Sequence, residues 1–311
     1  MIGKKYILFL LFVCAAFLSK AQQDPMYTQY MNQLLSINPA YAGAKGVTSA
    51  SIIAREQWVG WKGRPRTQTI YVHSPILDGK TGVGGSIVID NFGPVSNTSV
   101  YGDYSYTILY PNDRFLSLGL KGGVSFYQAA LSTIDLGIGD PSDPAFMSDV
   151  TRNFLPNAGV GVYFSSPDFY LGLSVPKLIA NRITERDVEI GTVGREQLHA
   201  FFMGGYVFDI NRIFKFKPYF MARLTPNSPL SVDLTAQFVF IEKFWLGGTY
   251  RTGDMFGVMA QIQATAQLKI GYAFDLTTSE LRVNNVGGTH EVFLQFDFSF
   301  GRGRVRSPRY F

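Results

Sequence analysis

A period-two alternation of apolar and polar residues recurs along this chain, and it constrains the fold more than any other feature. It is clearest in the segments 116–126, 230–240 and 292–300, where leucine, valine and phenylalanine alternate with small or polar residues. Successive side chains of a β-strand point to opposite faces, so this pattern predicts strands with one apolar and one polar face. After residue 21, no stretch approaches the ~20 consecutive apolar residues of a membrane-spanning helix.

Alternation alone fits two architectures, a soluble β-sandwich and a membrane β-barrel. The apolar faces are long and end in aromatic residues, as a lipid-facing band with aromatic girdles does. The polar faces are small and glycine-rich, unlike the lysine- and glutamate-rich surface of a typical soluble protein. Only 16% of the residues are charged, while 46% are hydrophobic and 15% aromatic. These features favour an all-β fold, a transmembrane antiparallel outer-membrane β-barrel.

We expect about 14 strands, each near the ~9–11 residues that a tilted membrane strand needs. Turn signals separate them at 111–113, 166–168, 226–229 and 252–254, and the shorter connections suit periplasmic turns. The expected strands centre on Ile52, Ile70, Ile87, Tyr104, Leu120, Val160, Leu171, Phe202, Phe220, Leu234, Leu246, Val258, Ile270 and Phe296.

The first 21 residues have the features of a signal peptide. Lys4 and Lys5 precede an uncharged apolar run over 6–18, and Ala21 supplies a small residue for cleavage. The only cysteine, Cys14, would leave with this segment, so disulfides and thiol chemistry are not expected. Three basic residues would leave too, which brings the mature chain near neutrality and makes a nucleic-acid partner unexpected.

The chain is therefore expected to have four parts. Residues 1–21 form the signal peptide and 22–46 an N-terminal segment in or under the barrel. Residues 47–300 form the barrel, and 301–311 a basic C-terminal tail. The stretch 26–37 lacks strand alternation, and Pro39 disfavours helix at Asn38, so a short helix in the lumen is one expectation. A flexible N-terminal arm is the alternative.

Three segments resemble the PorP/SprF proteins of the Bacteroidetes type IX secretion system. The first segment follows the expected signal peptide, the second includes the end of the first strand, and the third spans 82–94. The motif residues that carry the resemblance, and to which we assign structural roles, are Asp24, Pro25, Tyr30, Asn38, Pro39, Tyr41, Gly43, Arg55, Gln57, Trp58, Gly60, Asp90, Gly93 and Pro94.

This resemblance implies a non-enzymatic outer-membrane component that supports export or surface attachment of cargo proteins, such as gliding adhesins. The implied partners are outer-membrane lipid, other secretion components and the cargo, and no cofactor is implied. An outer-membrane channel for small solutes or lipids is the alternative function. A barrel hydrolase is the third class to consider.

Catalytic and metal-binding motifs are weak in this sequence. His73, His199 and His290 lie far apart, and no Gly-x-Ser-x-Gly or His-Glu-x-x-His motif is present. Roles in the lumen or at its edge are therefore expected for them. The aspartates of 135–149 lack the regular spacing of a calcium loop, and the Asp-Pro pairs among them indicate turns first.

Charged residues on the presumed inner faces could either line a charged channel or form cross-strand pairs that rigidify the lumen. Because both signs of charge are present, we favour cross-strand pairs. They are Asp103, Lys121, Lys215, Lys217, Arg223, Asp233, Arg251, Lys269 and Asp275.

The C-terminal tail carries Arg302, Arg304, Arg306 and Arg309, which are candidates for binding a periplasmic partner. A solvated end without a partner is the alternative. An even strand number puts both ends of a barrel on one side of the membrane. We therefore hypothesise that the tail and the N-terminal segment form a common docking surface.

Overall fold

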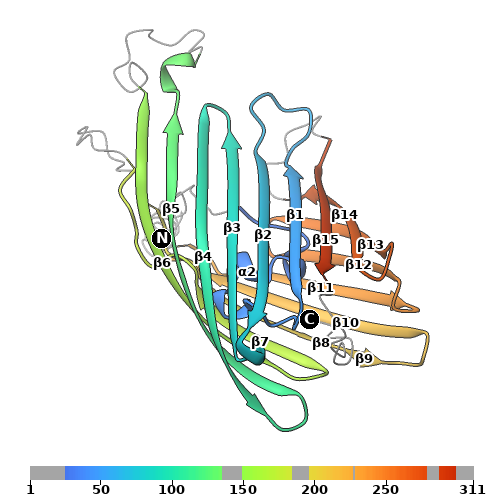
Figure 1. The fold of residues 1–311 in the computed structure, drawn as a ribbon. Coiled ribbons are helices and arrows are strands. Elements are labelled where there is room, and N and C mark those ends of the chain that lie inside the picture. The colour runs from blue at the N-terminus through green and yellow to red at the C-terminus, as the bar shows by residue number, and fades with distance from the viewer. Residues whose placement is uncertain (1–24, 135–148, 184–195, 227, 279–286, 299–311) are drawn as a thin grey trace, which may run out of the picture.

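The computed structural model describes residues 25–134, 149–183, 196–226, 228–278 and 287–298. They form one antiparallel sheet that closes on itself, because β1 pairs with both β2 and β15 while β10 pairs with both β8 and β11 (Figure 1). The strands are β1 (Thr48–Glu56), β2 (Arg66–Ile76), β3 (Thr81–Phe92), β4 (Val95–Tyr110), β5 (Arg114–Ala129), β6 (Val150–Ser165), β7 (Phe169–Val175), β8 (Ala200–Tyr206), β9 (Phe208–Asp209), β10 (Phe214–Leu224), β11 (Ser231–Phe240), β12 (Phe244–Arg251), β13 (Met255–Gln263), β14 (Leu268–Thr277) and β15 (Thr289–Phe298).

Strands β8 and β9 occupy one position in the ring. Both pair with β10, and they are separated only by Val207, whose amide donates to the carbonyl of Asp168 instead. The closed barrel therefore has 14 strands, which confirms the number and even parity expected from the sequence. Among the described residues, no helix is long and apolar enough to cross a membrane.

The two faces of the wall have opposite chemistry, and the apolar face is the outer one. Leu120 and Leu234 are 60% and 52% exposed, whereas their neighbours Lys121 and Thr235 are 5% and 3% exposed. A soluble sandwich would show the reverse, with apolar residues buried between its sheets. A ring of strands satisfies all its backbone groups internally, so an apolar exterior of this kind suits hydrocarbon. The soluble alternative is thereby excluded.

The two rims differ in the length of their connections. At the short-turn rim, no connection exceeds four residues; these are 77–80, 111–113, 166–168, 210–213, 241–243 and 264–267. At the long-loop rim the connections include 57–65, 130–149 and 176–199. Short turns face the periplasm in bacterial barrels, which assigns the short-turn rim to that side. Of the four turns expected from the sequence, two lie at this rim and two, around 226–229 and 252–254, lie at the other.

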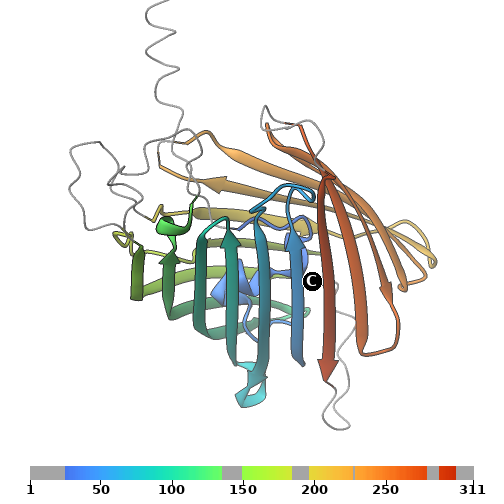
Figure 2. The ribbon, with the colours of Figure 1, turned by 90° about the horizontal axis from the view of Figure 1, so that it is seen from above.

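The segment 25–47 runs inside the barrel rather than outside or beneath it (Figure 2). It contains three short helical elements, η1 (Tyr30–Asn32), α2 (Leu34–Ile37) and η2 (Pro39–Tyr41). Their apolar side chains form the main core with residues from the inner wall, including Tyr71, Tyr163 and Met203. Two further helical turns, η3 (Leu77–Gly79) and η4 (Leu131–Thr133), lie in connections between strands.

Candidate functional site

The candidate site is the barrel lumen and the segment 25–47 that occupies it, here called the lumen segment. Part of this segment lies directly against glycines of the wall. A Cβ atom added at Gly82, Gly119 or Gly161 would lie 2.0 to 2.1 Å from atoms of the lumen segment. These three glycines belong to β3, β5 and β6, and we call them the glycine track. Only glycine leaves room there for residues 38–43 of the lumen segment, the motif Asn-Pro-Ala-Tyr-Ala-Gly, to pack this closely.

Asn38 fixes the turn that carries this motif. Its Oδ1 accepts a hydrogen bond from the amide of Ala40 at 3.0 Å, which caps η2, and Pro39 occupies the first helical position. Its Nδ2 donates to the carbonyl of Val162 in β6 at 2.9 Å. One side chain therefore both starts the helical turn and ties it to the barrel wall.

Gly43 ends the motif at a backbone conformation that favours glycine, with a φ of +69°. Its amide donates to Nδ1 of His73 at 3.1 Å, so this nitrogen must be unprotonated. The ring of His73 also contacts that of Tyr41, with 5.3 Å between centroids. His73 therefore has a structural role in holding the lumen segment.

The other two histidines also form hydrogen bonds to neighbouring strands or loops. Nδ1 of His199 lies 2.7 Å from Oγ1 of Thr225, and Nδ1 of His290 lies 2.6 Å from the hydroxyl of Tyr272. Within the described ranges, no group of histidine, cysteine, aspartate and glutamate side chains could hold a metal ion.

A buried charge cluster near the long-loop rim holds the beginning of the lumen segment. The carboxylate of Glu291 accepts hydrogen bonds from the amides of Thr28 and Gln29, both at 2.9 Å. Nη1 of Arg55 lies 3.1 Å from Oε2 of Glu291 and 2.8 Å from Oδ2 of Asp275. The hydroxyl of Thr28 accepts from Arg55 at 2.8 Å and donates to Asp275. Arg55, a motif residue, therefore acts inside the barrel.

A second cluster lies beside the first. Arg251 forms a bidentate pair with Asp233, with nitrogen–oxygen distances of 2.6 and 3.0 Å, and both side chains are buried. Its Nη2 also donates to the carbonyl of Tyr27 at 3.3 Å. Arg251 and Asp233 face each other directly between β12 and β11.

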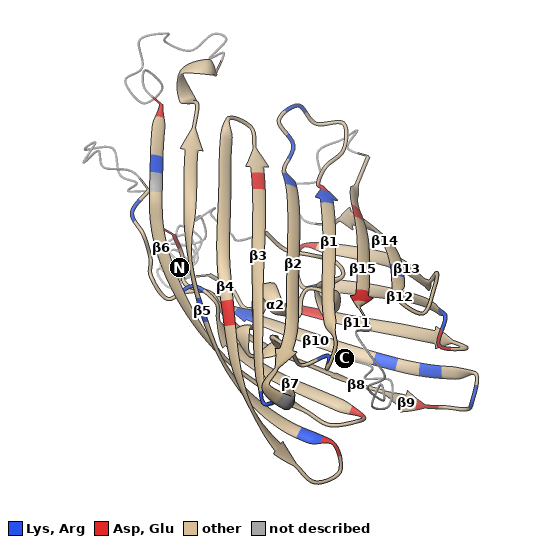
Figure 3. Ribbon diagram, in the orientation of Figure 1, with Lys and Arg blue, Asp and Glu red and all other residues tan. Residues whose placement is uncertain are grey.

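Lys121 and Asp103 make a further buried pair, at 3.1 Å between β5 and β4, and Lys121 also donates to the carbonyl of Leu35. The expectation of cross-strand pairs in the lumen is confirmed for these two pairs, Arg251 with Asp233 and Lys121 with Asp103. Figure 3 shows acidic and basic residues distributed sparsely along the strands, as an apolar wall requires.

The end of the lumen segment is held near the short-turn rim. Nζ of Lys45 lies 2.7 and 2.8 Å from the two carboxylate oxygens of Asp297, which also accepts from Ser49 at 2.7 Å. The lumen segment thus crosses the barrel from the long-loop rim to the short-turn rim.

The beginning of the described segment therefore lies at the rim opposite to the one where β15 ends, whereas its last residues lie at the same rim as that strand end. The C-terminal tail lies outside the described residues, so the common docking surface stays a prediction. Tyr27 and Thr28 bind residues near the long-loop rim, whereas β1 begins at the short-turn rim. The strand count places the start of β1, but it does not place a segment that folds back through the lumen.

The remaining motif residues lie mostly at the long-loop rim. The connection 57–65 bonds to Gly288 on one side through the amide of Val59, and to the amide of Gly93 on the other through the carbonyl of Gly63. Trp58 has a φ of 54°, and its indole donates to Oγ1 of Thr277 at 3.1 Å. The motif members at this rim are Gln57, Trp58, Gly60, Asp90, Gly93 and Pro94.

Several predicted site residues lie outside the described residues. They are Asp24, the aspartates within 135–148, and Arg302, Arg304, Arg306 and Arg309. Asp149 is described, and its carboxylate accepts the amide of Ser132 at 3.0 Å, which lowers the pKa of Asp149.

The partners of the lumen segment that the sequence did not reveal are Glu291, Gly119 and Gly161. Each stands on the polar or small face of an alternating strand, as many other residues do. What singles them out is contact with the lumen segment, for which the sequence offers no local signal.

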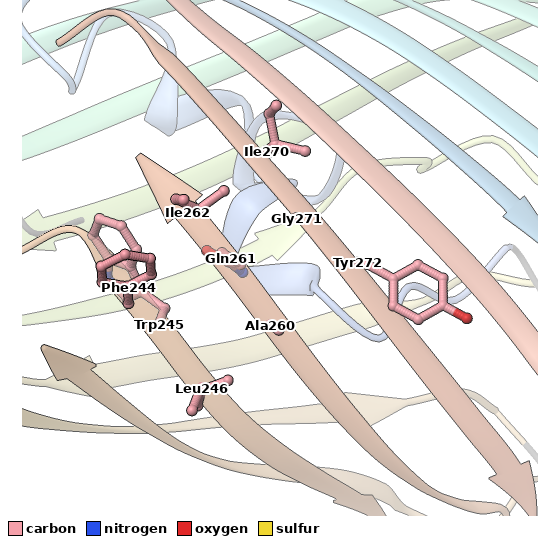
Figure 4. Close-up of a pocket in the computed structure, with 9 residues that line it drawn as sticks. All are labelled: Phe244, Trp245, Leu246, Ala260, Gln261, Ile262, Ile270, Gly271 and Tyr272. Atoms are coloured by element: carbon pink, nitrogen blue, oxygen red, sulfur yellow. The ribbon is translucent and has the colours of Figure 1, made fainter. Parts of the chain in front are cut away.

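An apolar groove of about 410 Å³ lies on the outer wall over β12, β13 and β14 (Figure 4). Phe244, Leu246, Ile270 and Tyr272 border it and are exposed, and Ala260 also lines it. The groove belongs to the apolar exterior of the wall.

Known proteins resemble this chain over most of its length. A sequence model described as "Type IX secretion system membrane protein PorP/SprF" matches residues 19–296. No curated protein matches the sequence. Among solved structures, the outer membrane protein Omp33 of Acinetobacter baumannii is similar, with 8% identity, a TM-score of 0.45, and coverage of 82% of this chain and 99% of that one. A Pseudomonas aeruginosa FadL homologue has 11% identity, a TM-score of 0.42, and coverage of 81% and 89%.

Proposed function

This chain belongs to the PorP/SprF family of type IX secretion system membrane proteins, and we propose that it supports export or surface attachment of cargo proteins through protein–protein contacts. It is an outer-membrane β-barrel. In this proposal the protein is a non-enzymatic part of the secretion machinery, and gliding adhesins are one class of cargo that it would serve.

The observation that supports a role through contacts is the occupied lumen. A porin conducts through a water-filled interior. Here the lumen segment packs closely against the glycine track on β3, β5 and β6. Buried ion clusters also hold it to β1, β14 and β15. A barrel filled in this way offers its rims to other proteins rather than its interior to solutes.

Two rims are available for such contacts. The connection 57–65 at the long-loop rim is held on both sides by backbone hydrogen bonds, so it presents a fixed surface. At the periplasmic side we propose that Arg302, Arg304, Arg306 and Arg309 bind acidic partners, since a guanidinium pairs carboxylates in a bidentate way. Exposed pairs of this kind are individually weak and sensitive to salt.

Deletion of the gene, followed by an inventory of secreted and surface proteins, tests the proposal. We expect specific proteins to disappear from the surface or the medium while the outer membrane stays intact, and the full-length gene to restore them. An unchanged inventory would refute the proposal.

The channel alternative is tested on the purified protein. Solute flux through liposomes that contain it, at the rate of an open porin, would favour a channel for small solutes or lipids. Flux that appears only after the lumen segment is destabilised would instead agree with a barrel that is normally filled.

A further inference from the structure

The barrel closes where its first and last strands meet, and the lumen segment binds this junction on its inner side. In the junction, β1 pairs with β15 from Thr48 opposite Phe298 to Glu56 opposite His290. No other neighbouring strands in the ring are so far apart in sequence, which makes this pairing the costliest in chain entropy. We call it the closing seam.

At the long-loop end of the closing seam, the lumen segment bonds to both strands. Arg55 of β1 and Glu291 of β15 are direct partners in the ladder. The amides of Thr28 and Gln29 donate to Glu291, and the hydroxyl of Thr28 accepts from Arg55. Without these groups, a buried glutamate would lose two hydrogen-bond donors, which is costly in a site that excludes water.

Next to this cluster, Tyr27 packs on the closing seam. It forms a buried apolar cluster with Ile53 and Phe293, which also face each other in the ladder between β1 and β15. The exposures of Ile53 and Phe293 are both 0%, and that of Tyr27 is 5%. An aromatic side chain of the lumen segment therefore covers one residue from each strand.

At the short-turn end, the same arrangement recurs with other residues. Asp297 of β15 accepts hydrogen bonds from Ser49 of β1 and from Lys45 of the lumen segment. The middle of the segment packs against strands away from the closing seam, along the glycine track of β3, β5 and β6 and against Ser174 of β7, whose hydroxyl donates to the carbonyl of Ile37. The segment thus spans the lumen between the closing seam and these strands.

We propose that the lumen segment is an internal clasp that holds the barrel closed, so that closure of the ring and capture of the segment are one coupled event. The proposal concerns how this barrel is assembled and kept closed, and it does not depend on the proposed role in secretion. The clasp is attached by the side chains of two residues, Thr28 toward the long-loop end of the closing seam and Lys45 toward its short-turn end.

Hydrogen exchange of the purified protein in detergent tests the clasp. The variant carries Thr28→Val, which removes the hydroxyl that bonds to Arg55 and Asp275, and Lys45→Met, which removes the ammonium that bonds to Asp297. Both substitutions keep the backbone amides. We expect amides of β1 and β15 to exchange at least about tenfold faster, because their local opening becomes easier, while amides of β3, β4 and β5 keep their rates.

The matched control is Ser174→Ala, which removes one hydrogen bond between the lumen segment and the wall away from the closing seam. It should leave the exchange of β1 and β15 unchanged. Unchanged exchange at the closing seam in the double variant, or equal acceleration in every strand, would overturn the proposal.

If the double variant does not assemble, the single variants Thr28→Val and Lys45→Met are measured in the same way. Each should accelerate exchange mainly in its own half of the closing seam. If both assemble with the exchange of the parent protein, the clasp is refuted. If neither assembles while Ser174→Ala does, closure requires these contacts, as proposed.

Discussion

Arg55 and Glu291 face each other across the first and last strands of the barrel, 3.1 Å apart and buried, with Thr28 of the lumen segment bonded to both. Asp275 completes the cluster, so one arginine bonds to two carboxylates in a part of the lumen shielded from water. Such an arrangement is sensitive to the loss of its cation, because the two carboxylates would then repel each other without compensation.

The first prediction follows from this cluster. Arg55→Ala should lower the free energy of unfolding by about 3–5 kcal/mol, since it leaves two buried carboxylates unpaired. Denaturant titration of the protein refolded in lipid vesicles measures the change. The control is Glu56→Gln, which removes a partly exposed rim pair with Arg64 and should cost at most about 1 kcal/mol. Equal effects of the two substitutions would contradict the structural importance of the buried cluster.

The second prediction concerns the glycine track. Gly119→Ala should destabilise the barrel by about 1–3 kcal/mol or displace the lumen segment, because the added methyl group would overlap the amide nitrogen of Ala40. Gly122→Ala lies in the same strand, but its added methyl group meets nothing within 4 Å. The temperature at which the folded barrel loses its gel mobility should fall for Gly119→Ala alone. A similar fall for both would mean that glycine matters only for the flexibility of β5.

The third prediction concerns the outer face. Leu234→Arg should cost roughly 2–4 kcal/mol, provided that Leu234 meets lipid near the middle of the bilayer. Leu224 is equally exposed but ends β10 at the long-loop rim, where the same substitution should cost about 0–1 kcal/mol. Refolding into vesicles at a series of urea concentrations gives both values. Equal costs would show that our assignment of depth is wrong.

The fourth prediction concerns the C-terminal tail. Removal of residues 301–311 should leave an assembled barrel that no longer retains periplasmic partners in a pull-down at low salt. The full-length protein at high salt is the control, since exposed arginine pairs weaken under those conditions. If the truncated protein keeps every partner, the tail does not bind them. A truncated protein that never reaches the outer membrane would show that the tail serves assembly instead.

The sequence by itself determined the strands, their even number and the face that each presents to lipid. These properties are local, because the orientation of each side chain follows from its place in a period of two residues. The alternation of Leu120 with Lys121 therefore predicted an exposed and a buried position correctly. The sequence also indicated that 26–37 departs from strand structure, although a position within or beneath the barrel, or a flexible arm, remained open.

Only the tertiary structure decided what fills the lumen and what it touches. Gly119 and Ala40, or Thr28 and Glu291, meet because the ring closes in one register around the lumen segment. Neither pair leaves a local trace in the sequence, since glycines and acidic residues on polar strand faces are common in this chain. The direction of the segment was equally hidden: the number of strands fixes where β1 begins, whereas contacts with Arg55 and Arg251 carry the preceding residues to the opposite rim.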